Sequence, residues 1–292
     1  MKPAGFDYLC PDTLDEALKA LDSSPGAMIL AGGQSLVPAM NFRLANPSKL
    51  IDLKNIKNLS QIDVTNDFVT IGSLVTHRDL ELNTSVKKVN PLISEAMQYV
   101  AHIPIRNHGT TIGSLCHADA AAEMPLILLL CDGNVTAKSV DGDRNITAED
   151  FFKFHMTTSK SANEIITSAR FKNLSHGCGY SFSEFARRHG DYAIAGAGAI
   201  IECGDDGLIE KAIVGGCGIN SRPVRLFEVE SIIEGSRLTE SELSAALAAS
   251  KQYVTTGDDM HATLSYRQHL LSNLMGKVLK EAMNRSLERL KN

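Results

Sequence analysis

Two adjacent glycines, Gly32 and Gly33, follow the short apolar run "AMIL" and constrain how this part of the chain folds. The run, residues 27–30, predicts a buried strand, and "KLIDL" at residues 49–53 predicts a second one. Glycine adopts positive φ angles at little steric cost, so the pair predicts a sharp turn where the first strand ends. With a helix predicted over residues 12–22, the chain begins with a helix–strand–turn–strand unit.

The glycine pair has two interpretations. It is a plain tight turn, or its successive N–H groups point into one concavity that holds an anion, typically a phosphate. Gln34 and Ser35 follow directly and offer side-chain hydrogen bonds, and Ser35 is also a candidate cap for a helix after the turn. Neither G-x-G-x-x-G nor a Walker loop is present, so the glycines alone leave both interpretations open.

The hydrophobic pattern changes twice further along the chain. Residues 59–77 alternate and contain turn residues, which predicts hairpin strands, and residues 84–101 predict one helix. Strands are predicted near residues 134–140 and 164–171. After residue 176, two strand pairs precede three helical stretches, the last long and amphipathic. We therefore predict three units: residues 1–55, 56–175 and 176–292.

A polar segment without regular period, residues 102–125, lies in the second unit and ends at the apolar "LILLL". Segments of this length are functional or disordered, and the apolar boundary favours a packed, functional one. Its "GTTIGS", Gly109 to Ser114, is either an ordinary loop or a second backbone cradle, and two cradles suit a diphosphate. Asp119 and Glu123, spaced i and i+4, would share a helix face, either as ribose-binding carboxylates or as a solvated helix start.

The segment "ARRHGDYA" offers Arg187 and Arg188 for anion binding and Tyr192 for stacking on a flat ring, or it is a charged turn between strands. His117 has no second histidine at metal-ligand spacing, so we expect a structural role. The six cysteines are scattered without a C-x-x-C pair, which argues against a metal or iron–sulfur site in this chain. No Ser-His-Asp, H-E-x-x-H or hydrolytic carboxylate pattern is present, so we expect no catalytic residues.

Charge and hydropathy limit the partners and the location of the protein. The formal net charge is −5, without a block of Lys or Arg, so nucleic acid is not expected as a main partner. No apolar run is long enough to span a membrane, and the N-terminus lacks the apolar region of a signal peptide. We expect a cytoplasmic protein whose cysteines are buried thiols.

Several stretches resemble one family along nearly the whole chain. "AGGQSLVPAMNFRLANPSKLIDL", "RNHGTTIGSLCHADAAAEMP", "FARRHGDYAIAGAGAII" and "SYRQHLL" resemble the FAD-binding medium subunit of molybdenum hydroxylases. That family includes the carbon monoxide dehydrogenase, xanthine dehydrogenase and quinoline oxidoreductase flavoproteins. The resemblance implies an α+β fold, in which a two-part FAD-binding domain of the PCMH type precedes a C-terminal α+β domain of the CO dehydrogenase flavoprotein type.

The resemblance also implies where FAD binds. Backbone N–H groups from Ala31 to Leu36 would hold the pyrophosphate, and Glu123, with or without Asp119, would contact the ribose or pyrophosphate. Ile165 or Ile166 would lie against the flavin ring, near Tyr192. The implied cofactor-binding residues are Leu30, Ala31, Gly32, Gly33, Gln34, Ser35, Leu36, Val37, Thr76, Gly109, Thr110, Thr111, Ile112, Gly113, Ser114, Asp119, Glu123, Ile165, Ile166, Arg187 and Tyr192.

The second loop departs from the family pattern. The family reads T-I-G-G-S or T-I-G-G-N, whereas this chain has "TTIGS", so Ile112 stands where the first glycine would be. If that position needs a positive φ angle, Ile112 is strained there. The expected consequence is a shifted loop or weaker flavin binding.

The implied function is electron transfer in a three-subunit enzyme. A large molybdopterin subunit would hydroxylate the substrate, a small subunit would carry two [2Fe-2S] clusters, and FAD in this chain would reduce NAD, oxygen or a quinone. A dimer of heterotrimers, a heterohexamer, is the implied assembly. "HADAAAEMP" resembles the branch that acts on N-heteroaromatic substrates. The alternatives are a free-standing FAD-dependent oxidase or reductase with its own substrate pocket, and a non-catalytic scaffold with a decayed flavin site.

Overall fold

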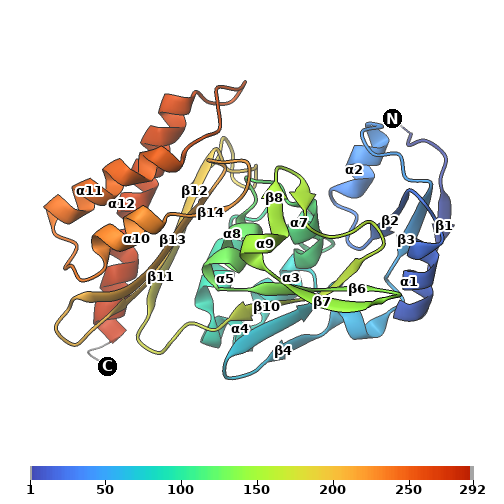
Figure 1. Ribbon diagram of the computed structural model, residues 1–292, viewed down its shortest axis with the longest axis horizontal. Coiled ribbons are helices and arrows are strands. Elements are labelled where there is room, and N and C mark those ends of the chain that lie inside the picture. The colour runs from blue at the N-terminus through green and yellow to red at the C-terminus, as the bar shows by residue number, and fades with distance from the viewer. Residues whose placement is uncertain (1, 290–292) are drawn as a thin grey trace.

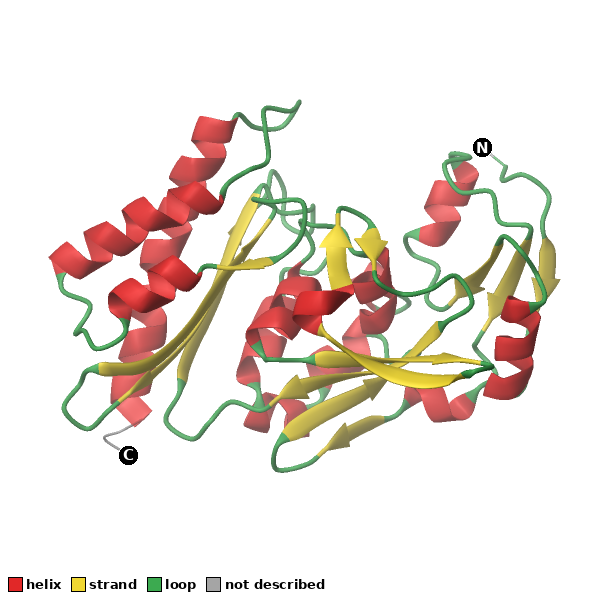
Figure 2. Ribbon diagram, in the orientation of Figure 1, coloured by secondary structure: helices red, strands yellow, loops and turns green. Residues whose placement is uncertain are grey.

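The three larger β-sheets, built from successive parts of the chain, lie in a row along the long axis of the molecule (Figure 1). The computed structural model describes residues 2–289. Helices pack between the second and third sheets and cover the outer face of the third (Figure 2). No helix described between residues 2 and 289 is long and apolar enough to cross a membrane.

The first sheet, blue in Figure 1, is parallel, with strand order β1-β3-β2. Thr13 caps the first helix, because its hydroxyl accepts a hydrogen bond from the Glu16 N–H. The central strand is buried, as expected, but β2 is an edge strand and its Met28 is 41% exposed, so the prediction of a buried strand at residues 27–30 is wrong. The elements are β1 (Asp7–Leu9), α1 (Leu14–Asp22), β2 (Ala27–Leu30), α2 (Leu36–Asn41) and β3 (Lys49–Asp52).

The second sheet is antiparallel, with strand order β4-β5-β10-β6-β7. The helix predicted over residues 84–101 is two helices, since Asn90 leaves the helical conformation and Pro91 begins a new helix. The sheet consists of β4 (Ile62–Val64), β5 (Phe68–Gly72), β6 (Asn134–Ser139), β7 (Gly142–Thr147) and β10 (Ile165–Lys172). The other elements are η1 (Lys57–Ser60), α3 (His77–Leu82), α4 (Thr84–Val89), α5 (Pro91–Met97), α6 (Ile103–Arg106), α7 (Thr111–His117), α8 (Glu123–Leu130), α9 (Ala148–Phe151), β8 (Phe152–Phe154) and β9 (Thr157–Thr158).

The third sheet is an antiparallel meander in the order β11-β12-β13-β14, followed by the three predicted helical stretches. The long last helix covers one face of this sheet, as its amphipathic pattern predicts (Figure 1). The elements are β11 (Gly179–Phe185), β12 (Ala195–Cys203), β13 (Ile209–Cys217), β14 (Val224–Arg225), α10 (Phe227–Ile233), α11 (Glu240–Ser250), η2 (Lys251–Tyr253) and α12 (Leu264–Arg289).

Helix α8 packs between the part of the chain that forms the second sheet and the part that forms the third, and all of its side chains are buried. Two of its leucines pack on glycines of the third sheet. A Cβ atom at Gly198 would lie 2.7 Å from Leu130 Cδ1, and one at Gly215 would lie 2.8 Å from Leu126 Cδ1. A larger residue at either of these two positions would therefore push the helix away from the sheet.

A polar contact ties the edge of the third sheet to the second part. The carboxylate of Glu95 on α5 accepts a hydrogen bond from the Phe182 N–H, at 2.8 Å, on edge strand β11. Its other oxygen pairs with Arg285 of α12 at 2.7 Å. Arg285 also donates to the Tyr180 carbonyl. An edge N–H that water would otherwise solvate is thus paired inside the protein.

We expect Leu130→Ala to destabilise the protein by about 2–5 kcal/mol, because Leu130 is completely buried and its removal leaves a cavity on the glycines of the sheet. Leu44→Ala is the matched control, since Leu44 is 83% exposed and its truncation removes little buried surface. Urea unfolding of both variants measures the difference. Equal midpoints for the two variants would contradict the packing described for α8.

Candidate functional site

The two glycine-containing loops are in direct backbone contact. The first loop, residues 31–36, follows β2, and the second loop, residues 109–114, leads into α7. A Cβ atom at Gly32 would lie 2.2 Å from the His108 carbonyl oxygen and 2.8 Å from Gly109 Cα. Only glycine permits this approach. The structure therefore brings together two segments that the sequence predicts separately as cradles.

The first loop presents N–H groups that have no partner. Gly33 has a φ angle of +71°, and Leu30 and Val37 flank it. The N–H groups of residues 32–35 donate to no acceptor within residues 2–289. Ser35 precedes α2 but makes no side-chain cap, contrary to its candidate role. A half-buried row of unpaired N–H groups suits an anion.

The second loop is largely satisfied by the protein itself. Thr110 caps α7, because its hydroxyl accepts a hydrogen bond from the Gly113 N–H at 3.1 Å. The N–H groups of Gly109 and Thr111 donate to the carbonyls of Ile105 and Val75. Thr76 forms a β-bridge with Thr110 and caps α3. The second loop therefore offers fewer free donors than the first.

The expected strain at Ile112 is absent. Ile112 lies in α7, has no positive φ angle and is 2% exposed among core side chains. The glycine that the local structure requires is Gly113, since a Cβ atom there would lie 2.7 Å from Thr110 Oγ1. The departure "TTIGS" thus fits this loop without distortion, and the reason for a shifted loop is removed.

Asp119 and Glu123 do not share a helix, contrary to the prediction. Helix α7 ends at His117 and is capped by Ala118, which has a φ angle of +51°, whereas Glu123 is the first residue of α8. Asp119 lies in the turn between them and accepts a hydrogen bond from the Ala121 N–H. Both side chains are buried, so neither belongs to a solvated helix start.

The carboxyl of Glu184 lies near these two, and no sequence pattern points to it. Burial, together with the charge of Asp119, raises the pKa of Glu123 to about 7. Burial and the charge of Glu123 raise the pKa of Glu184 on β11 to about 9. Glu184 Oε2 has no hydrogen-bond partner. These acids form a carboxyl cluster, residues 119, 123 and 184, where the second and third parts meet.

A cavity of about 890 Å³ lies beside this cluster. Three predicted site residues line it: Asp119, Arg187 and Tyr192. Phe154 and His155, from the β8–β9 hairpin, line another side, and pattern reasoning missed them because their strands are only two or three residues long. The volume is ample for a ring system of a cofactor or substrate.

Tyr192 connects the cavity with the first loop. Burial and the nearby carboxyls of Asp119 and Glu123 raise the pKa of Tyr192 to about 12, and a hydrogen bond with Ser35 partly opposes this rise. The side chain is nevertheless 54% exposed, so its ring has surface left to cover a ligand. Arg187 contacts His261 at 3.4 Å, from a loop that sequence reasoning did not connect with the site.

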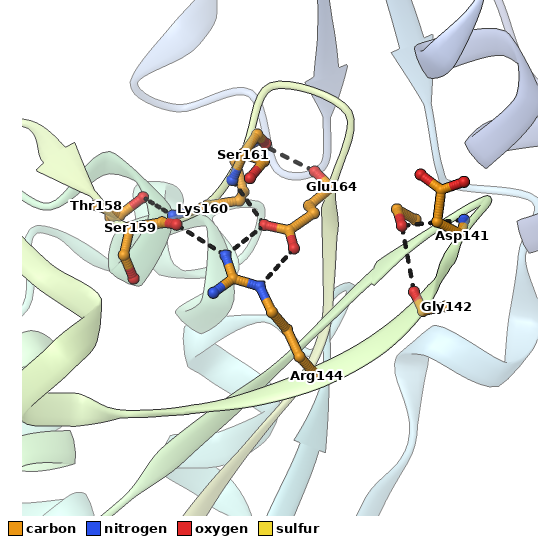
Figure 3. Close-up of polar contacts among 9 residues, drawn as sticks. Asp141, Gly142, Arg144, Thr158, Ser159, Lys160, Ser161 and Glu164 are labelled. Atoms are coloured by element: carbon orange, nitrogen blue, oxygen red, sulfur yellow. Dashed lines mark hydrogen bonds and ion pairs between the residues drawn. The ribbon is translucent and has the colours of Figure 1, made fainter.

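The two isoleucines predicted to face a flavin lie in hydrophobic cores. Ile165 packs with the core of the first part and Ile166 with that of the second, and they are 2% and 3% exposed. Neither lines the cavity. The start of their strand, β10, is held by the ion pair of Glu164 with Arg144, at 2.7 Å (Figure 3). Contact of these isoleucines with a flavin stays a prediction.

Comparison with protein families gives matches to both halves of the structure. Residues 4–171 match a family described as "FAD binding domain in molybdopterin dehydrogenase". Residues 180–282 match one described as "CO dehydrogenase flavoprotein C-terminal domain". The first match contains both glycine loops and the β8–β9 hairpin, and the second contains Tyr192.

Individual proteins are similar over nearly their whole length. The chain is 38% identical to the 6-hydroxypseudooxynicotine dehydrogenase complex subunit alpha of Paenarthrobacter nicotinovorans, covering 98% of this chain and 97% of that protein. It is 36% identical to the nicotine 6-hydroxylase medium subunit of the same organism, covering 97% and 99%. A chain of quinoline 2-oxidoreductase from Pseudomonas putida 86 superposes with a TM-score of 0.94 at 31% identity, covering 98% and 100%.

We expect the stability of the FAD-free protein to fall between pH 4.5 and 7, in part because of Glu123. The folded state retains the Glu123 proton up to about pH 7, whereas the unfolded chain releases it near 4.5, so stability is lost as pH rises. Glu123→Gln removes this contribution, about 1–3 kcal/mol, since one pKa unit corresponds to about 1.4 kcal/mol.

Urea unfolding at pH 4.5 and 7.5 measures this difference between the wild type and Glu123→Gln. The control is Glu228→Gln, because Glu228 is exposed on α10 and far along the chain from the cluster. An unchanged pH dependence in Glu123→Gln would show that Glu123 does not hold a proton in the folded state.

Proposed function

This chain belongs to the FAD-containing medium subunits of the molybdenum hydroxylases, and we propose that it transfers electrons within such an enzyme. The observation that carries the proposal is the first loop, with its row of unpaired N–H groups in backbone contact with the second loop. Its electrons would come from iron–sulfur clusters of a partner subunit and leave to an external acceptor.

The residues present fit FAD. The N–H groups of residues 32–35 would hold the pyrophosphate, which is anionic and has no competing partner there. Asp119 and Glu123 would face the ribose or pyrophosphate region, and Tyr192, whose ring is half exposed, would cover the flavin ring. Arg187, on the same loop as Tyr192, lines the adjoining cavity.

Bound FAD supplies the chemistry of accepting electrons from one partner and releasing them to another. The chain's own residues bind and orient it and set the charge around it. Sequence reasoning found no set of residues for acid–base turnover of a substrate, which agrees with a transfer role. Oxidation of the substrate would then belong to a large molybdopterin subunit, and two [2Fe-2S] clusters to a small subunit, in a dimer of heterotrimers.

We infer an N-heteroaromatic compound as the substrate of the whole enzyme. The support is the similarity of this chain to subunits named for nicotine, 6-hydroxypseudooxynicotine and quinoline enzymes. Those names describe the relatives. The substrate would bind to the large subunit, so the described residues of this chain do not select it.

The first test is the visible spectrum of the chain, purified alone and with its co-expressed partner subunits. We expect FAD in stoichiometric amount, and reduction of that FAD by an N-heteroaromatic substrate in the complex only. The reason is that substrate oxidation needs the molybdopterin subunit, whereas FAD binding needs the two loops of this chain. Anaerobic spectra and identification of the released cofactor provide the measurement.

Other outcomes of this test separate the alternatives. Turnover by the chain alone would overturn the transfer role in favour of a free-standing FAD oxidase or reductase. The absence of flavin from both preparations would indicate a non-catalytic scaffold. The same complex, reduced and then mixed separately with NAD, oxygen and a quinone, identifies the acceptor by its rate of flavin reoxidation.

We expect Gly33→Val to abolish FAD binding and leave the fold intact. Valine at a φ angle of +71° is strained, and its Cβ atom would lie 3.3 Å from Leu30 and Val37, so the loop N–H groups would turn away from the pyrophosphate. Gly235→Val is the matched control, because Gly235 has a φ angle of +76° and no atom near its Cβ position. Flavin content and far-UV circular dichroism are measured, and stoichiometric FAD in Gly33→Val would contradict the proposed site.

A further inference from the structure

A buried histidine lies under the point where the two loops meet. His77 is the first residue of α3, and its N–H donates to the Gly109 carbonyl at 2.9 Å. Two residues further along, the Thr111 N–H donates to the Val75 carbonyl at 3.1 Å. The backbone of residues 75–77 therefore pairs with the second loop as a short ladder.

The imidazole adds a side-chain contact to this ladder. His77 is 5% exposed, and its Nδ1 lies 3.3 Å from the hydroxyl of Thr111, which is completely buried. The ring also supports Gly109, because a Cβ atom there would lie 3.2 Å from His77 Cδ2. Gly109 in turn touches Gly32 of the first loop. The imidazole, the second loop and the first loop thus lie in successive contact.

His77 is held as a neutral imidazole. Burial and the nearby Arg106 guanidinium lower its pKa to about 4, although the charge of Glu81 partly opposes the shift. Arg106 is itself paired with Glu81 at 3.0 Å and donates to the Val100 carbonyl. The protonation state of His77, and with it the contact with Thr111, therefore does not change near neutral pH.

We propose that His77 is a positioning residue for FAD, which sets the second loop against the first at the spacing that the pyrophosphate requires. The inference rests on the proposed function, since it assumes that FAD occupies the two loops. His77 is too buried to touch the cofactor, so it acts through Gly109 and Thr111. Its role is geometric and involves no proton transfer.

The experiment titrates FAD-stripped enzyme, prepared as the full complex, with free FAD. We expect His77→Leu and Thr111→Val each to weaken FAD binding at least tenfold, because each removes one partner of the same contact. The double variant should bind no more weakly than the weaker single variant, since both changes break one interaction. His77→Asn should stay within about threefold of the wild type, because its side-chain amide reaches the position of Nδ1.

The thermal midpoint of each FAD-stripped variant separates positioning from general destabilisation. We expect FAD affinity to fall in His77→Leu and Thr111→Val even where the midpoints of these two variants agree with that of His77→Asn. If His77→Leu does not fold, Thr111→Val and His77→Asn still decide the question. Wild-type FAD affinity in Thr111→Val, or additive losses of affinity in the double variant, would overturn this inference but leave the proposed function standing. No FAD binding by the wild type would overturn the proposed function, and this inference with it.

Discussion

The contact of helix α8 with the glycines of the third sheet determines how the rest of the molecule is arranged. Leu126 and Leu130 sit where Gly198 and Gly215 leave room, so the helix packs against the strand backbone itself. The same helix begins at Glu123, one of the carboxyl cluster. These side chains are closely packed against the strand backbone. The packing of α8 therefore holds the FAD-binding part, which contains the first loop, against the C-terminal part, which contains Tyr192.

A second constraint, at the loops, is also a contact between backbones. Gly32 and Gly109 are far apart in sequence, yet Gly32 has no room for a side chain, because a Cβ atom there would lie 2.8 Å from Gly109 Cα. Glycine in the first loop is therefore required twice, by the positive φ angle of Gly33 and by the contact of Gly32. A plain tight turn would need only the former. The contact shows that the first loop is more than a simple turn, and the support for a binding role comes from its unpaired N–H groups.

Sequence patterns predicted the local elements well and their surroundings poorly. Periodicity found α1, the β4–β5 hairpin and the C-terminal meander, because each depends on nearby residues. It placed residues 27–30 inside a sheet, although β2 is an edge strand, since an apolar run does not reveal how many neighbours a strand has. Sequence patterns missed Glu184 for a related reason. Its raised pKa depends on the charge of Glu123, and the packing of α8 brings these two residues, which are far apart in sequence, close together. The prediction of a single helix over residues 84–101 was wrong for a local reason, because Pro91 begins a second helix.

The carboxyl cluster shows how this packing changes the electrostatics of the site. Counted from the sequence, Asp119, Glu123 and Glu184 would place three negative charges beside a proposed anionic ligand, a strongly repulsive arrangement. Burial raises the pKa of Glu184 to about 9 and that of Glu123 to about 7, so near pH 7 Glu184 is neutral and Glu123 is partly protonated. The docking of the third sheet, which buries Glu184, therefore lowers the negative charge beside the first loop. An anionic pyrophosphate and the electrons delivered to a flavin would both meet less repulsion there than the sequence alone suggests.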